Sequence, residues 1–134
     1  MAKLKTIKAL FDPSGNSDHR SIGDHPLGVI MPANAIICGG AIEVITTCQS
    51  TAGGTDKATI AVHVSSANDI VSAVAIETGT PWDDGFRAIV PAPQTASTWV
   101  KPTAAKEITV TVGTAALTAG KFWVHLWYFQ GDAE

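Results

Sequence analysis

The segment 121–129, KFWVHLWYF, constrains the fold most, because as a strand it has no polar face. Successive side chains of an extended strand point to opposite sides of a sheet. A half-exposed antiparallel strand therefore alternates apolar and polar residues. Here one side carries Phe122, Val124, Leu126 and Tyr128, and the other carries Trp123, His125, Trp127 and Phe129. Both sides need cover, and the core of one small domain covers only one. The second cover comes from more of the same chain, another subunit or a ligand.

The rest of the sequence also predicts strands rather than helices. Short β-branched runs are separated by Gly, Pro, Asn, Asp and Ser, and helical periodicity is almost absent. The predicted strands are 3–11, 23–31, 35–49, 58–65, 86–90, 107–113 and 121–129, while 69–77 is ambiguous between a strand and a helical turn. We expect 107–113 to pair with the aromatic strand as a hairpin. This pattern favours an all-β fold, an antiparallel β-sandwich of the jelly-roll type.

A length of 134 residues predicts one domain. We expect residues 27–134 to form its β-sandwich body and residues 1–26 to form an extended N-terminal arm or the first strand. Charged residues make up only 16% of the chain, against about 25% in a typical protein, and a surface short of charge often lies against another protein.

The charge pattern and the hydropathy exclude several partners. The net charge is −3 and no basic patch contains interleaved aromatics, so we expect no nucleic-acid partner. No apolar run reaches the length of a spanning helix, and the first residues contain no secretory signal, so we expect no membrane partner and synthesis in a cytoplasm.

Candidate chemical groups do not form a recognisable active site. His19 and His25 lie near Asp18 and Asp24, residue types that can bind a metal, but their spacing matches no metal-site rule and favours a solvated polar loop. The sequence has no G-x-S-x-G motif, and neighbouring carboxylates such as Asp83 and Asp84 usually cap or solvate a turn. We therefore predict no enzyme activity, no metal and no cofactor.

The two cysteines and two of the tryptophans allow alternative interpretations. Cys38 and Cys48 are too few for a disulfide framework, which favours small buried hydrophobic residues over a disulfide pair. Trp82 and Trp99 lie in predicted loops, where exposed indoles can stack on sugars. Tryptophans also pack in interfaces and at the ends of sandwiches, and we favour this packing interpretation.

Two segments carry a resemblance to a known protein class. The run EITVTVGTAALTAGKFWVHLWY at 107–128 and the run LGVIMPANAIICGGAIEVITT at 27–47 resemble small structural proteins of tailed bacteriophages. The turn PWDDG at 81–85 fits the same class, so the resemblance covers most of the chain from residue 27 onward. Its motifs are strand and turn patterns without reactive residues.

This resemblance implies a capsid decoration (cement) protein, a class that sits as trimers between capsomers and clamps the shell. It implies a homotrimer that binds the major capsid protein on the capsid exterior, after synthesis in the host cytoplasm. For self-association we predict the side chains of Trp123, His125, Trp127 and Phe129. For an arm that contacts neighbouring subunits we predict Leu4, Ile7, Leu10 and Phe11.

Two other classes of function remain open from the sequence. One is a tail or fibre module that recognises a host glycan or receptor through Trp82, Trp99 and the acidic turn. The other is a small cytosolic β-sandwich enzyme. Only the four histidines favour this class, and they are His19, His25, His63 and His125.

Overall fold

The β-branched and aromatic runs form eight strands in a computed structural model that describes residues 4–50, 58–65, 70–76, 82, 85–89 and 101–130. The strands are β1 (Leu4–Phe11), β2 (Gly23–Met31), β3 (Ala35–Ser50), β4 (Thr59–His63), β5 (Val71–Ala75), β6 (Gly85–Ile89), β7 (Lys106–Gly113) and β8 (Leu117–Gln130). A short 3₁₀ helix, η1 (Ser17–His19), lies between β1 and β2. Within the segment 69–77, which the sequence left ambiguous, residues 71–75 form the strand β5.

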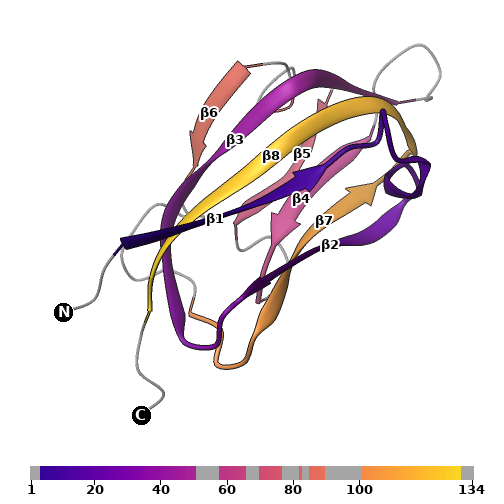
Figure 1. Ribbon diagram of the computed structural model, residues 1–134. Helices are drawn as coiled ribbons and strands as arrows, with labels where there is room; N and C mark the ends of the chain where they lie inside the picture. The colour runs from indigo at the N-terminus through magenta and orange to yellow at the C-terminus, as the bar shows by residue number, and fades with distance from the viewer. Residues whose placement is uncertain are drawn as a thin grey trace.

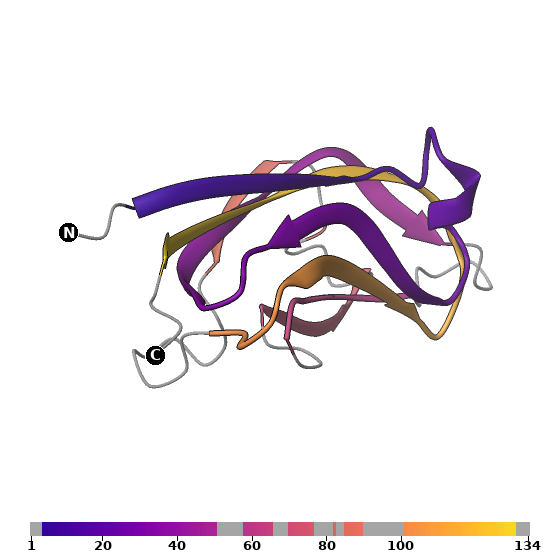
Figure 2. The same cartoon turned by 60° about the horizontal axis from the view of Figure 1, so that its bottom comes forward.

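The strands form two four-stranded antiparallel sheets (Figure 1). Sheet A has the order β1-β8-β3-β6, and sheet B has the order β2-β7-β4-β5. The first strand pairs with the last, the second with the seventh, the third with the sixth and the fourth with the fifth. The chain is thus doubled back on itself and wrapped into two layers, which Figure 2 shows from another side. The jelly-roll sandwich predicted from the sequence is confirmed.

The core lies between the two sheets and follows from strand alternation. The inward side chains of β8 are buried, and so are the inward side chains of β4 and β7 that face them. The predicted inward set of β4 is confirmed, since Ile60, Val62 and the following Val64 are all buried. The largest fully buried side chains include Trp82, Phe11, Phe122, Met31, Ile37 and Ile42.

The predicted hairpin of 107–113 with the aromatic strand is wrong. β7 pairs with β2 and β4 in sheet B, whereas β8 pairs with β1 and β3 in sheet A. The connection turns at Thr114, which has φ 71°, and carries the chain from one sheet to the other. Local alternation predicted both strands correctly, but it contains no information on which strand is the neighbour.

Of the two alternatives for residues 1–26, the first strand fits the described residues. β1 pairs with β8 without interruption from Leu4 opposite Phe129 to Phe11 opposite Phe122. Residues 12–22 form a loop across one end of the sandwich, where Ser14 N donates to Gly120 O at 3.0 Å and Leu117 N donates to Arg20 O at 2.8 Å. Residues 4–11 therefore form an edge strand of sheet A, and the division of the chain into an arm and a body stays a prediction.

Candidate functional site

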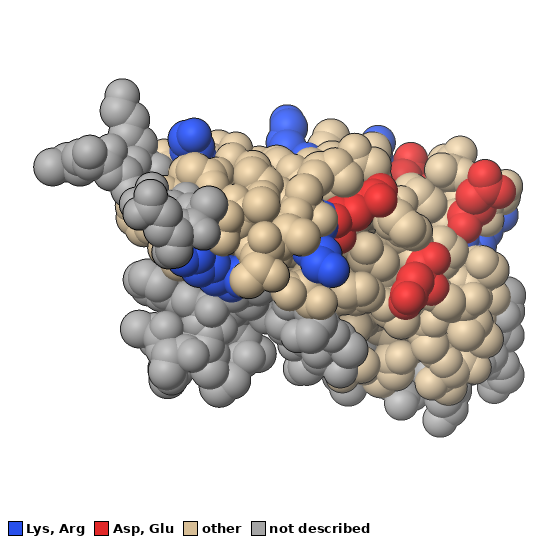
Figure 3. Space-filling view, turned by 90° about the horizontal axis from the view of Figure 1, so that it is seen from below, with Lys and Arg blue, Asp and Glu red and all other residues tan. Residues whose placement is uncertain are grey.

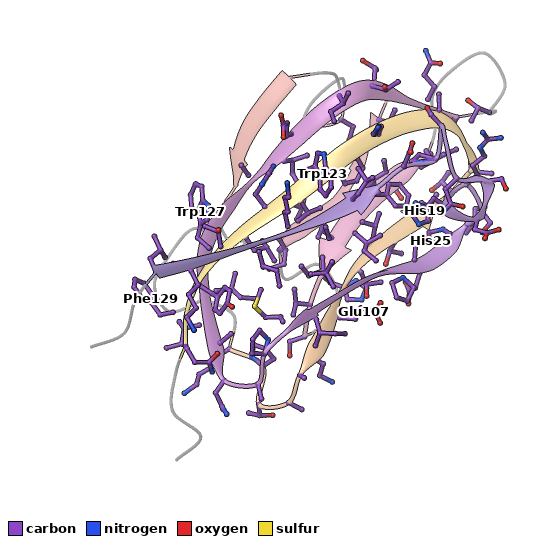
Figure 4. All side chains as sticks on the ribbon, in the orientation of Figure 1. His19, His25, Glu107, Trp123, Trp127 and Phe129 are labelled. Atoms are coloured by element: carbon purple, nitrogen blue, oxygen red, sulfur yellow. The ribbon has the colours of Figure 1, made fainter. Side chains whose placement is uncertain are left out.

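Between residues 122 and 130 of β8, the outward side chains are Trp123, His125, Trp127 and Phe129, which is one of the two sets that the alternation predicts. All four are partly accessible, and Trp127 is 36% exposed. The inward residues between them are buried in the core. Figure 4 shows Trp123, Trp127 and Phe129 spaced along β8. Among the residues that the structure describes, no second layer covers this side of sheet A.

The neighbouring strands extend this surface, which we call the aromatic face: the outward side chains of β1, β8 and β3. On β1 the residues opposite the four β8 side chains are Leu10, Lys8, Thr6 and Leu4, in that order. On β3 they are Glu43, Ala41, Gly39 and Ile36. Leu4 is 56% exposed beside Phe129, so the aromatic face continues to the sheet edge.

The predicted arm residues Leu4, Ile7, Leu10 and Phe11 separate into two groups. Leu4 and Leu10 lie on the aromatic face beside Phe129 and Trp123. Ile7 packs against the core, and Phe11 is fully buried with its ring 5.2 Å from that of Phe122. Alternation within β1 turns the Phe11 side chain into the core of its own chain, and the partner contact of the four arm residues stays a prediction.

Two polar interactions structure the aromatic face. The Lys8 ammonium lies 4.6 Å from the centre of the Trp123 ring, a cation–π contact. The His125 Nε2 atom lies 3.1 Å from Glu43 Oε1, and both side chains are partly exposed. Next to this pair, a hollow of about 300 Å³ is lined by Thr6, Ala41, Glu43, His125 and Trp127. The small Ala41 and the short Thr6 leave this space between larger neighbours.

A β-bulge in β3 lies beside the hollow. The register shifts between Ile37 and Gly39, so Cys38 is the extra residue, and its Sγ atom lies 3.6 Å from Trp127 O. Burial raises the pKa of the Cys38 thiol. Cys48 lies in the core, as predicted for a small buried hydrophobic residue, whereas Cys38 is only partly buried.

His19 and His25 come together at the opposite end of β1, but as a packed cluster. The His19 ring stacks on Phe11 at 4.9 Å and lies 5.9 Å from the His25 ring (Figure 4). Asp12 N donates to His19 Nδ1 at 3.0 Å, and His25 Nε2 lies 2.6 Å from Ser21 O. Burial lowers the pKa of His19 below 6.5, and His25 lowers it further. Within the described part of the chain, no three His, Cys, Asp or Glu side chains are grouped to hold a metal.

The other two histidines do not meet. His63 lies on β4 in sheet B, where its Nδ1 atom is 3.4 Å from Thr111 Oγ1, and Thr111 Oγ1 donates to Asp24 Oδ1 at 2.6 Å. His125 lies on β8 in sheet A.

On the side of the molecule seen in Figure 3, charges of both signs are scattered among uncharged residues. In the described residues, no helix is long and apolar enough to cross a membrane.

The tryptophan alternatives are separated in part. Trp82 is fully buried, and its ring lies 4.9 Å from that of Phe122. Its face is therefore not available to a sugar, which favours the packing interpretation. Trp99, Asp83 and Asp84 lie outside the described residues. Trp127, which the sequence placed on one side of the strand at 121–129, has an exposed indole on β8.

The fold is similar to that of chains in three bacteriophage capsid structures. A chain of the cyanophage Pam1 capsid asymmetric unit matches with a TM-score of 0.66 and 16% identity, over 96% of this chain and 85% of that chain. A chain of the acidic stable capsid structure of Helicobacter pylori bacteriophage KHP30 matches with a TM-score of 0.58 and 15% identity, over 96% of this chain and 93% of that chain. A chain of the Ralstonia phage GP4 capsid matches with a TM-score of 0.59 and 15% identity, over 98% of this chain and 86% of that chain. No protein-family model and no curated protein sequence matches this chain.

Proposed function

We propose that this chain is a non-enzymatic structural protein of a bacteriophage virion. The similarity over 96–98% of the chain to chains from three capsid structures carries this proposal. Within this class we propose a decoration (cement) protein, which binds the major capsid protein between capsomers on the capsid exterior. Its chains are made in the host cytoplasm and stabilise the assembled shell.

The aromatic face supports a role in protein contacts. Large aromatic residues are enriched in protein interfaces, and an accessible apolar surface on a small protein marks a contact site. We propose that Trp123, His125, Trp127 and Phe129 form the contact between copies of a homotrimer. Covering these side chains removes apolar area from water, which gains about 25 cal/mol for each Å² buried.

Trimer formation also explains how a small protein can stabilise a shell. Three identical bodies held together can bind several capsid subunits at once. Multivalent attachment raises retention on the shell without one tight site, because each later contact forms at a high effective concentration.

The first experiment measures self-association by light scattering. The purified protein is expected to have three times the 13.9 kDa mass of one chain. Trp127→Glu places a charge on the aromatic face and should give monomers with unchanged far-UV circular dichroism. His63→Glu places the same charge on the outer side of sheet B and should leave the trimer intact. A monomeric wild-type protein would contradict the self-association part of the proposal.

The second experiment tests the role on the capsid. Capsids assembled without this protein should bind it and then resist heating to a higher temperature, as followed by release of packaged DNA. The Trp127→Glu variant should bind less and protect less than His63→Glu. Capsids that neither bind the protein nor gain heat resistance would contradict the decoration role.

A further inference from the structure

The two outward tryptophans of β8 have different surroundings. Trp123 carries the Lys8 ammonium over its ring, supplied by the same chain. Trp127 borders the hollow together with Glu43, whose carboxylate also faces His125 Nε2 at 3.1 Å, and among the described residues no Lys or Arg side chain lies over the Trp127 ring. An indole and a carboxylate that line the same hollow can together hold a cation, because the ring face and the carboxylate both attract positive charge.

Lys5 is a cation that the chain places away from its own hollow. It lies opposite Tyr128 and therefore on the inward side of β1, whereas Thr6 and the hollow are on the outward side. Near the start of β1, residues 4–6 are nevertheless all exposed, and this end of β1 projects at the side of the molecule in Figure 2. Lys5 therefore lies in an exposed part of β1, where a neighbouring copy can reach it.

Lys5 and Glu43 of the same chain are too far apart to form an ion pair. Glu43 lies opposite Trp123, which lies opposite Leu10. Lys5 is thus five residues away along the strand, about 17 Å, and two strands away across the sheet, about 10 Å. The two side chains also leave sheet A on opposite faces.

We propose that the projecting end of β1 from one copy docks at the hollow of the next copy, with the Lys5 ammonium between the Trp127 ring and the Glu43 carboxylate. This inference rests on the proposed self-association, and it names which part of one copy contacts which part of the next copy. The contact is heterologous, because a strand end meets a hollow, and a heterologous contact closes into a ring when its rotation fits. The exposed Leu4 beside Lys5 is then covered in the same contact.

A charge exchange tests the pairing by light scattering and sedimentation equilibrium of the full chain. Lys5→Glu and Glu43→Lys should each raise the trimer dissociation constant at least about tenfold, because each brings like charges together. The double variant Lys5→Glu/Glu43→Lys should return to within about threefold of wild type, because opposite charges meet again. Lys106→Glu, an exposed change on β7, is the matched control and should have no effect.

The outcomes separate this inference from the proposed function. Restoration in the double variant supports the Lys5–Glu43 contact, since these residues cannot meet within one chain. If wild type forms trimers that Trp127→Glu breaks, but the single charge reversals leave them intact or the double variant stays dissociated, the inference is overturned and the self-association proposal stands. A wild-type monomer overturns both, while the capsid-binding experiment still decides the decoration role.

Discussion

The outer faces of sheets A and B differ in what their side chains contact. On sheet B, Asp24, Thr111 and His63 form a chain of polar contacts across β2, β7 and β4. On sheet A, the outward residues of β8 from 123 to 129 are three aromatic side chains and one histidine, and the Trp127 side chain is partly exposed to solvent. Both sheets cover the same core, so burial inside the sandwich does not explain this difference. The outer face of sheet B combines this polar row with the exposed Ile30 of β2, whereas the outer face of sheet A carries a row of large aromatic side chains along its β8 strand.

The largest expected effect comes from the backbone under the aromatic face. A methyl group on Gly40 would collide with the backbone carbonyl of His125, which cannot rotate away. Gly40→Ala should therefore cost about 3 kcal/mol of unfolding free energy, as overpacking does. In sheet B, a methyl on Gly113 would meet only the Thr59 hydroxyl, which can turn. Gly113→Ala should cost less than about 1 kcal/mol. Urea denaturation measures both, and equal losses would contradict the difference between the sheets.

An intermediate effect separates the two outward glutamates. Glu107 Oε2 accepts a hydrogen bond at 2.6 Å from the backbone N–H of Gly28, at the register shift of β2 (Figure 4 labels Glu107). Glu107→Ala should lower the unfolding free energy of the protein by about 1 kcal/mol, because this charged hydrogen bond is lost. Glu43→Ala removes only a partly exposed pair with His125 and should change monomer stability by a few tenths of a kcal/mol. Chemical denaturation of the monomeric Trp127→Glu background separates these effects from association. A larger loss for Glu43→Ala would show that its role is in the fold.

The smallest expected effect is a pH dependence at the loop over β1. Because the pKa of His19 is lowered in the folded protein, the unfolded chain binds its proton more readily. The stability that neutral His19 provides is present above pH 6.5 and is lost as the pH falls below 6.5 toward the folded pKa. His19→Phe keeps a ring against Phe11 and removes the titration, so its melting temperature should fall less between pH 7 and pH 5. His63→Gln is the control and should follow wild type. An unchanged slope in His19→Phe would remove His19 as the cause.

The sequence predicted the elements better than their neighbours. Strand alternation correctly placed Ile60, Val62 and Val64 inward, and it correctly divided β8 into two faces. It failed on the partner of β8, since the predicted hairpin with 107–113 is replaced by pairing with β1 and β3. Local patterns report which side chains share a face, whereas pairing depends on contacts between segments far apart in the chain.

The candidate site was predicted in part for the same reason. Trp123, His125, Trp127 and Phe129 share a face in any strand, and the structure places this face outward. Leu4 and Leu10 join them only because β1 pairs with β8. Glu43 had no distinguishing signal in the sequence, and it enters the site because β3 brings it opposite Trp123.

By itself, the sequence determined that the chain forms strands and that β8 is apolar on both sides, because side-chain period and turn residues are local properties. Only the tertiary structure decided which side of β8 faces the core, since that depends on how the chain wraps into two sheets. The same wrapping buries Phe11 and Trp82 and leaves Trp127 accessible. It also places Lys5 and Glu43 on opposite faces of sheet A, because residue parity and strand register together determine where each side chain points.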